Sequence, residues 1–144
     1  MENITYDDFK KLEMRIGWIR FVEPVEGTDK LLRFEIDFGP EKNITSSDEE
    51  MQTSEDNENK IEELPFGKEE YRGRDIRQIV SGIREFFPKY KALEGKKALY
   101  VVNLEPREIR GVMSYGMLMA VDGLDGQPVF LTAEGTVEAG SSVR

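Results

Sequence analysis

The 144-residue sequence contains no cysteine and no histidine. Without cysteine the chain has neither disulfides nor a thiolate metal site. Without histidine it lacks the usual general base near neutral pH and the commonest ligand of transition metals. Carboxylate pairs could still hold a hard cation or move a proton, but acidic proteins contain such pairs routinely. We therefore expect a protein that is not an enzyme, with no catalytic residues, no metal site and no cofactor.

Long apolar runs are also missing. No run approaches the roughly 20 residues that a membrane-spanning helix needs. The first residues, MENITYDDFKKLEMR, carry acidic side chains early and no apolar stretch typical of a secretion signal. These absences predict a soluble, cytoplasmic protein with no membrane association. A chain of 144 residues is long enough for one domain with a full core, and we expect residues 1–144 to form it.

Basic side chains are outnumbered, and the acidic excess lies mainly in one segment. The net charge is -9, and residues 40–72 alone contain four basic and eleven acidic side chains. This segment is rich in serine, asparagine and glutamate, and its few apolar residues follow no strand or helix period. It buries too little apolar surface to offset its ordering entropy. We interpret 40–72 as an acidic insertion, mobile over 40–60, that is either a tolerated solvated loop or a partner-binding arm.

Short β-branched and aromatic runs fill much of the remaining chain. In 31–39, positions 32, 34, 36 and 38 are apolar and positions 33, 35 and 37 are charged, which predicts a strand with one solvent-exposed face. Further strands are predicted at 14–22, where Gly17 indicates a bulge or tight bend, and at 74–83, 96–104 and 114–121. A short helix is predicted at 6–11 and a broken one at 83–93. Residues 129–143 form short extra strands or a tail.

Five short strands with a helix between the third and fourth predict an all-β fold. Glycines at the bends favour a five-stranded Greek-key barrel of the oligonucleotide-binding (OB) type. A β-sandwich or another small barrel fits the strand count almost as well.

The segment NLEPREIRGVMSYGMLMAV, residues 103–121, sets Arg107 and Arg110 beside a Ser-Tyr-Gly-Met turn and an apolar strand. A cationic rim at a strand end predicts contact with an anionic partner, despite the acidic total.

Five segments, in order along the chain, resemble one protein family. They are DFKKLEMRIGWI, DKLLRFEIDFG, RQIVSGIREF, GKKALYVVNLEPREIRG and SYGMLMA. The family is the tRNA-binding domain found at the C-terminus of many methionyl-tRNA synthetases, in the beta subunits of the archaeal enzyme and in free-standing structure-specific tRNA-binding proteins. The resemblance covers 5–39 and 73–144, implies an OB barrel and implies tRNA binding. It also makes methionyl-tRNA synthetase a partner to consider.

Two alternatives to tRNA binding remain. A related secretion-type chaperone dimer shares the fold and binds peptides, but it usually lacks the RQIVSGI and S-x-G-M motifs that stand here at 77–83 and 114–117. The other alternative is a module that docks onto a synthetase and contacts tRNA only weakly.

The OB architecture and the resemblance together place RNA-binding side chains along strands two and three and in the flanking loops. Lysine and arginine would contact phosphates, while asparagine and serine could bond to phosphates or ribose 2′-hydroxyls. The predicted RNA-binding residues are Lys30, Arg33, Arg77, Ser81, Asn103, Arg107, Arg110, Ser114 and Met117.

Several of these residues also have a purely structural interpretation. Arg33 could belong to the exposed face of its strand, and Met117 could belong to the core. Asn103 and Ser114 could close turns through bonds to the backbone.

The segment 103–117 departs from the family in its charge. The family commonly has lysine where Glu105 and Glu108 stand, so this segment is neutral here. Fewer phosphate contacts would weaken tRNA binding at cellular ionic strength. Tyr115 could compensate by stacking on a splayed base, or it could simply face solvent.

The C-terminal segment QPVFLTAEGTVEAGSSVR resembles the extension through which members of this family dimerise. A homodimer would double the surface offered to RNA. We expect a homodimer with Val129, Leu131 and Val143 in its interface.

Overall fold

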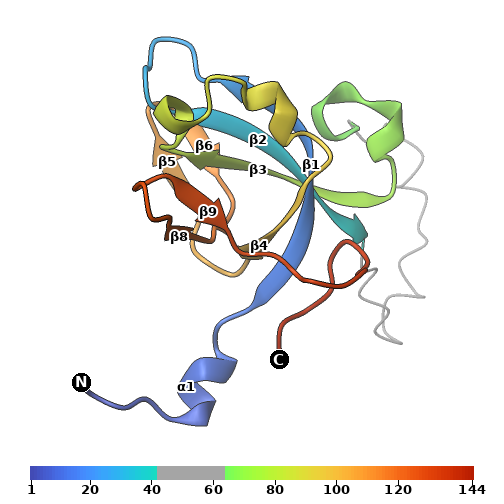
Figure 1. The fold of residues 1–144 in the computed structure, drawn as a ribbon. Coiled ribbons are helices and arrows are strands. Elements are labelled where there is room, and N and C mark those ends of the chain that lie inside the picture. The colour runs from blue at the N-terminus through green and yellow to red at the C-terminus, as the bar shows by residue number, and fades with distance from the viewer. Residues whose placement is uncertain (42–63) are drawn as a thin grey trace, which may run out of the picture.

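A computed structural model describes residues 1–41 and 64–144 of the chain. Residues 42–63, which hold most of the predicted acidic insertion, lie outside the described residues. The described parts are mostly β, with one short α-helix and several 3-10 turns (Figure 1). The elements are α1 (Tyr6–Lys10), β1 (Met14–Pro24), β2 (Leu32–Pro40), η3 (Pro65–Gly67), η4 (Glu69–Tyr71), β3 (Arg74–Ser81), η5 (Arg84–Phe86), η6 (Tyr90–Leu93), β4 (Lys97–Val101), β5 (Arg107–Ile109), β6 (Val112–Ser114), β7 (Met117–Leu118), β8 (Ala120–Asp122) and β9 (Pro128–Phe130).

Five strands form one antiparallel sheet in the order β3-β2-β1-β4-β7. The long strand β1 pairs with β4 along its first half and with β2 along its second, so it bends across the sheet (Figure 1). The backbone N–H of Tyr115 donates to the carbonyl of Gln78 at 2.9 Å and brings the chain after β6 back to β3. The sheet therefore curls into a half-barrel, and the predicted all-β, OB-like fold is confirmed.

The irregularity in β1 lies beyond the position that the sequence predicts. The pairing register of β1 with β2 shifts between Ile19 and Phe21, and not at Gly17. Gly17 is required for another reason, because a Cβ atom there would collide with the side chains of Ile36 and Phe38. The missing side chain lets β1 pass close to β2.

Strand β2 supplies the centre of the core, and its apolar side chains at 32, 34, 36 and 38 are buried as predicted. The opposite face of β2, predicted to be exposed, is buried as well. Glu35 is 2% exposed, and Asp37 is fully buried. That prediction is wrong because segments distant in the sequence cover this face.

Glu35 is covered by the segment that follows the undescribed residues. The Tyr71 hydroxyl donates to Glu35 Oε1 at 2.9 Å, and Lys68 Nζ donates to the same oxygen at 2.8 Å. Tyr71 is 1% exposed. The sequence places Lys68 and Tyr71 in the predicted acidic insertion, whereas the structure packs both against β2. The end of that segment is therefore part of the barrel wall.

Asp37 is held by two arginines from neighbouring strands. Arg20 and Arg74 both donate to Oδ2 of Asp37 at 2.7 Å, and the backbone N–H of Gly39 donates to Oδ1 at 2.8 Å. Burial raises the pKa of Asp37, but the bonds from Arg74, Gly39 and Arg20 outweigh it and hold the pKa below its usual value. Asp37 is thus an ionised structural carboxylate.

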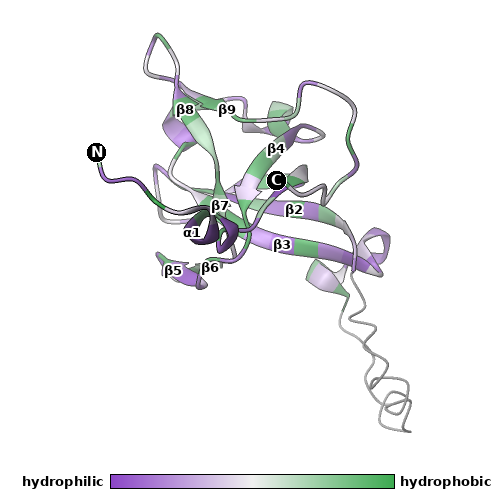
Figure 2. Ribbon diagram, turned by 90° about the horizontal axis from the view of Figure 1, so that it is seen from below, coloured by the Kyte–Doolittle hydropathy of each residue, from purple (hydrophilic) through white to green (hydrophobic). Residues whose placement is uncertain are grey.

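Two predicted elements differ in detail from the structure. The helix predicted at 83–93 is present as the two 3-10 turns η5 and η6 on either side of Pro88, which interrupts regular helix. The strand predicted at 114–121 is divided, because β7 pairs with β4 while β8 pairs with β9. This change of partner lets the chain leave the main sheet and form a separate hairpin (Figure 2).

Candidate nucleic-acid interface

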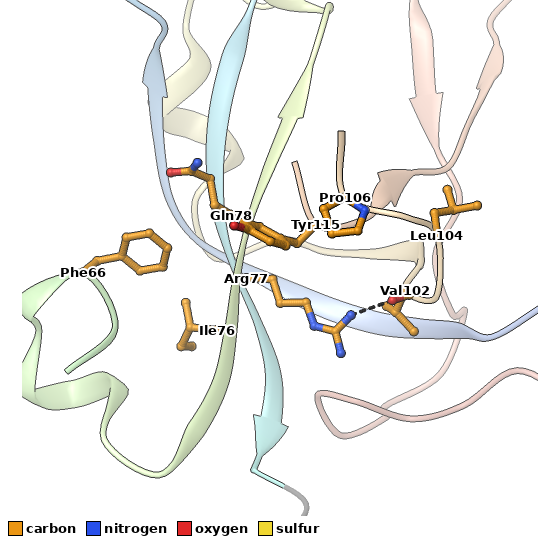
Figure 3. Close-up of a pocket in the computed structure, with 8 residues that line it drawn as sticks. All are labelled: Phe66, Ile76, Arg77, Gln78, Val102, Leu104, Pro106 and Tyr115. Carbon is orange, nitrogen blue, oxygen red and sulfur yellow. Dashed lines mark hydrogen bonds between the residues drawn. The ribbon is translucent and has the colours of Figure 1, made fainter. Parts of the chain in front are cut away.

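Two neighbouring pockets lie between β3 and the chain from Val102 to Leu118. One has a volume of about 390 Å³ and includes Phe66 and Tyr115 in its lining, and we call it the Phe66–Tyr115 pocket (Figure 3). The other has a volume of about 580 Å³ and includes Ser81 and Arg107, and we call it the Ser81–Arg107 pocket. Leu104 lines both. We call the two pockets together the hairpin groove.

The hairpin that gives the groove its name is formed by β5 and β6, in a stretch that the sequence predicts as a loop. Its turn consists of Arg110 and Gly111, with φ of +52° and +82°. Positive φ at both central residues is typical of the type I′ turn that joins two paired strands. The usual Asn-Gly or Asp-Gly signal is replaced here by Arg-Gly, so the hairpin is hard to recognise in the sequence.

Many of the predicted RNA-binding residues converge on this groove. Ser81, Arg107, Ser114 and Met117 line the Ser81–Arg107 pocket. Arg77 lines the neighbouring pocket (Figure 3). These residues come from β3, β5, β6 and β7, which the curl of the sheet brings together.

Exposed positive charge is present at the hairpin. Arg107 and Arg110 are exposed, and neither forms an ion pair or hydrogen bond through its side chain within the described residues. Glu105 and Glu108 are exposed close by in sequence. The guanidinium groups are therefore available to an anionic partner, although the local net charge is zero as the sequence predicts.

A further cationic residue near the groove is absent from the sequence prediction. Arg84 follows Gly82, which lines the Ser81–Arg107 pocket. Its backbone N–H donates to the carbonyl of Lys30 at 3.0 Å, and its Nη1 donates to the carbonyl of Thr28 at 2.7 Å. The Arg84 side chain thus has no carboxylate partner in the described part of the chain, and its backbone lies against that of the exposed Lys30. Its position in a predicted helix gave no sign of this.

Similarity to known proteins identifies the kind of domain. A family model described as "Putative tRNA binding domain" matches residues 60–142. The chain belongs to this family. It is a family of binding domains and not of catalytic ones, and the resemblance noted in the sequence is confirmed.

Relatives of this tRNA-binding domain include much longer proteins. The methionine–tRNA ligase of Lactococcus lactis subsp. lactis (strain IL1403) is 35% identical over 144 residues, which are 99% of this chain and 17% of the ligase. The methionine–tRNA ligase of Xylella fastidiosa (strain M23) is 35% identical over 98% of this chain and 15% of the ligase. The chain thus spans about a sixth of the length of these relatives.

Solved structures share the fold over the whole chain. A MetRS related protein from Pyrococcus horikoshii is 29% identical and has a TM-score of 0.69. The match covers 100% of this chain and 100% of that protein. The chaperone CsaA from Bacillus anthracis str. Ames has a TM-score of 0.66 over 99% of this chain and 100% of CsaA, with 20% identity. The likeness to CsaA shows the fold alone.

Arg33 of the tRNA-binding domain is occupied by contacts within the barrel. Its guanidinium donates to Glu23 at 2.6 Å, to Glu35 at 2.8 Å and to the side-chain oxygen of Gln78 at 3.1 Å. It also lies over the ring of Phe66 at 5.7 Å. These contacts leave Arg33 paired with two glutamates within the barrel.

Arg77 is also largely paired. Its Nε and Nη2 donate to the carboxylate of Asp75 at 3.1 and 3.2 Å, and its Nη1 donates to the carbonyl of Val102 at 2.7 Å. The guanidinium lies over the ring of Phe38 at 5.3 Å. The pocket that it lines is therefore close to neutral.

Asn103 and Ser114 bond to the backbone of their own chain. Asn103 accepts from the N–H of Glu13 at 2.8 Å and donates to the carbonyl of Lys11 at 2.6 Å, so it ties the segment after α1 to the end of β4. Ser114 accepts from the N–H of Val80 and donates to the carbonyl of Gly116, both at 3.0 Å. The structural interpretation accounts for both side chains.

The residues predicted for a dimer interface lie in the C-terminal part. Val129 and Val143 are exposed, whereas Leu131 is partly buried. The carbonyl of Leu131 accepts from the N–H of Leu99 at 2.8 Å, and its N–H donates to the carbonyl of Met119 at 3.1 Å. Val129 pairs across the β8–β9 hairpin with Val121, which is also exposed. The hairpin thus presents two uncovered valines.

A metal-binding cluster and a membrane-spanning helix are both absent from the described residues. No group of three or more acidic side chains there is arranged to hold a metal ion. No helix among residues 1–41 and 64–144 is both long and apolar enough to cross a membrane.

Proposed function

We propose that this tRNA-binding domain recognises the folded shape of tRNA through the hairpin groove and acts in the cytoplasm as a homodimer. The observation that carries the proposal is the pair Arg107 and Arg110, exposed and without side-chain partners in the described residues, at the edge of a groove lined by β3. Arginine offers a planar fork of donors that suits phosphate oxygens. Lys30 and Arg84 would extend this contact along the phosphate backbone.

We further propose that the domain works either as a free-standing protein or as an accessory subunit of a methionyl-tRNA synthetase. The relatives named methionine–tRNA ligase support a place in this system. The Pyrococcus horikoshii protein, matched over its full length and named as MetRS related, supports a module of this size acting without a catalytic domain in the same chain.

We expect the affinity for tRNA to fall as the salt concentration rises, because the proposed contacts are ionic. With about four phosphate contacts, binding of bulk tRNA should weaken by about two decades between 50 and 200 mM salt. Replacing both hairpin arginines, as Arg107→Ala with Arg110→Asn, should lower the salt slope by about two, since each lost phosphate contact removes about one. Asparagine tolerates the positive φ at position 110, so the turn should persist. Fluorescence anisotropy at several salt concentrations measures both effects.

The matched control is the double variant Lys10→Ala with Lys89→Ala. It removes the same two charges from exposed positions that line neither pocket. An equal loss in both double variants would mean that only total charge matters. No binding of tRNA even at low salt would contradict the proposal and leave the synthetase-docking alternative.

The homodimer is tested by mass in solution. We expect sedimentation equilibrium to give twice the chain mass of 16.6 kDa. The change Val129→Glu should shift the equilibrium toward monomer, because it places a charge at an apolar contact. Val129 is 52% exposed, so the barrel itself should keep its thermal stability. A monomer at all concentrations would contradict the proposal.

A further inference from the structure

The Phe66–Tyr115 pocket differs in character from its neighbour. Its volume of about 390 Å³ lies in the range of roughly 300–1,000 Å³ typical of pockets that enclose small ligands. In Figure 3, Phe66 stands at one end of the row of lining residues, Leu104 and Val102 at the other, and Tyr115 between them. The lining is mainly apolar, with Arg77 and Gln78 as its polar members.

Large apolar side chains around this pocket remain open to solvent. Phe66 and Tyr115 are each 43% exposed, and Leu104 is 46% exposed. Scattered exposed apolar residues are common on any protein, but several grouped around one hollow indicate a binding site.

The ring of Phe66 is held in place by its surroundings. Its backbone has φ of +58°, a conformation that bulky side chains rarely adopt. Tyr71 meets the ring edge-on at 6.4 Å between centroids, and the guanidinium of Arg33 lies 5.7 Å from it. Such strained positions persist where the neighbouring structure imposes them, and they gather at functional sites.

The backbone of Tyr115 is hydrogen-bonded to β3, while its side chain is exposed. Its N–H donates to the carbonyl of Gln78 at 2.9 Å. Its neighbours Ser114 and Gly116 line the Ser81–Arg107 pocket, while Tyr115 lines the other. Its hydroxyl has no hydrogen-bond partner within the described residues. The backbone of Tyr115 is therefore fixed beside β3, and its exposed ring is available to a ligand.

The polar groups of the pocket are neutral or compensated. Arg77 is paired with Asp75. The Gln78 side chain accepts from Arg33 at 3.1 Å and donates to the carbonyl of Met113 at 2.8 Å, which fixes its orientation. Its second N–H has no partner in the part of the chain that the structure describes. An uncharged planar ligand suits this lining better than a phosphate does. Cationic charge with no partner among residues 1–41 and 64–144 lies instead at Arg107, in the adjoining pocket.

From these contacts we propose that the Phe66–Tyr115 pocket receives one unstacked nucleobase of a single-stranded RNA segment. The base stacks on Tyr115, Phe66 closes the end of the pocket, and the neighbouring phosphate reaches Arg107. Stacking on an aromatic side chain tolerates any base, because every base has a π-face. The inference extends the proposed tRNA binding and rests on it.

The experiment has two readouts. The first is the affinity for bulk tRNA of Tyr115→Leu, which should fall about ten-fold or more with an unchanged salt slope. Tyr115→Phe keeps the ring and should bind as the wild type does. The matched control is Phe86→Leu, since Phe86 is 41% exposed and lines neither pocket. The second readout is the fluorescence of a short single-stranded RNA containing one 2-aminopurine, which stacking on Tyr115 should quench.

The outcomes separate the pocket from the wider function. If Tyr115→Leu leaves the affinity for tRNA unchanged, the pocket proposal is overturned and the proposed function is not affected. If tRNA does not bind, quenching that is lost in Tyr115→Leu still supports the pocket, and absence of quenching overturns it. The pocket proposal is also overturned if an unstructured apolar peptide reverses the quenching and unlabelled RNA does not. The occupant of the pocket would then be a peptide side chain.

Discussion

Replacement of Glu35 by alanine is expected to lower the free energy of unfolding by about 3 kcal/mol at neutral pH. Glu35 is 2% exposed and accepts hydrogen bonds from Arg33, Lys68 and Tyr71. Alanine would leave the two cations and the Tyr71 hydroxyl without this acceptor, and unpaired buried polar groups are costly. Urea denaturation measures the change.

The control for Glu35→Ala is Glu69→Ala. Glu69 pairs with Arg72 at 2.9 Å on the surface, where both side chains are largely exposed. Solvent screens such pairs, so we expect no measurable change. Equal destabilisation by the two variants would show that the buried cluster has no special weight.

The same carboxylate predicts how stability depends on pH. Burial raises the pKa of Glu35, but the hydrogen bonds from Lys68, Arg33 and Tyr71 outweigh it and hold the pKa below the usual value. A lowered pKa in the folded state stabilises the fold above the unfolded pKa of about 4.3, and this stability is lost as the pH falls through the folded pKa. The variant Glu35→Gln should therefore lose less stability than the wild type between about pH 5 and the folded pKa.

The second large effect is expected for Gly140→Ala, at about 3 kcal/mol. Gly140 has φ of +88°, and a Cβ atom there would collide with the backbone carbonyl of Phe38. The glycine and the segment after it are bonded to β1. The N–H of Gly140 donates to the carbonyl of Ile16 at 2.7 Å, and the N–H of Val143 donates to the carbonyl of Met14 at 3.0 Å. The C-terminal segment would have to leave β1 to relieve the collision.

The control Gly126→Ala separates the two causes in this prediction. Gly126 has φ of +80° and no atom within 4 Å of an added Cβ, so alanine there meets only the backbone penalty of about 1 kcal/mol. Urea denaturation of both variants should show the larger loss at 140. Equal losses would mean that the tail adapts without cost.

The Glu35 cluster connects stability with the proposed site. Tyr71, which donates to Glu35, also meets the ring of Phe66 edge-on. Arg33 joins the same cluster to Gln78 in the Phe66–Tyr115 pocket. A weakened cluster should therefore loosen one end of the pocket even where the barrel remains folded.

The order of residues alone is sufficient for the family and for the strands of the main sheet, but not for the β5–β6 hairpin. The alternation from 32 to 38 identifies the core face of β2, because side chains alternate strictly along a strand. The motifs RQIVSGI and S-x-G-M favour the tRNA-binding family, which the family model confirms. The lack of histidine and cysteine is likewise a matter of composition, and it removes the usual general base near neutral pH and the thiolate metal ligands.

Which charged groups are available depends instead on tertiary contacts. Arg33 lies in β2 and Arg107 lies in β5. Arg33 is paired with Glu23 and Glu35. Arg107 has no side-chain partner in the described residues. Lys68 and Tyr71 come from a segment more than 30 residues away in sequence and cover the face of β2 that its alternation marks as exposed. Local periodicity fixes where a side chain points, but the partners that it finds there depend on contacts between segments distant in the chain.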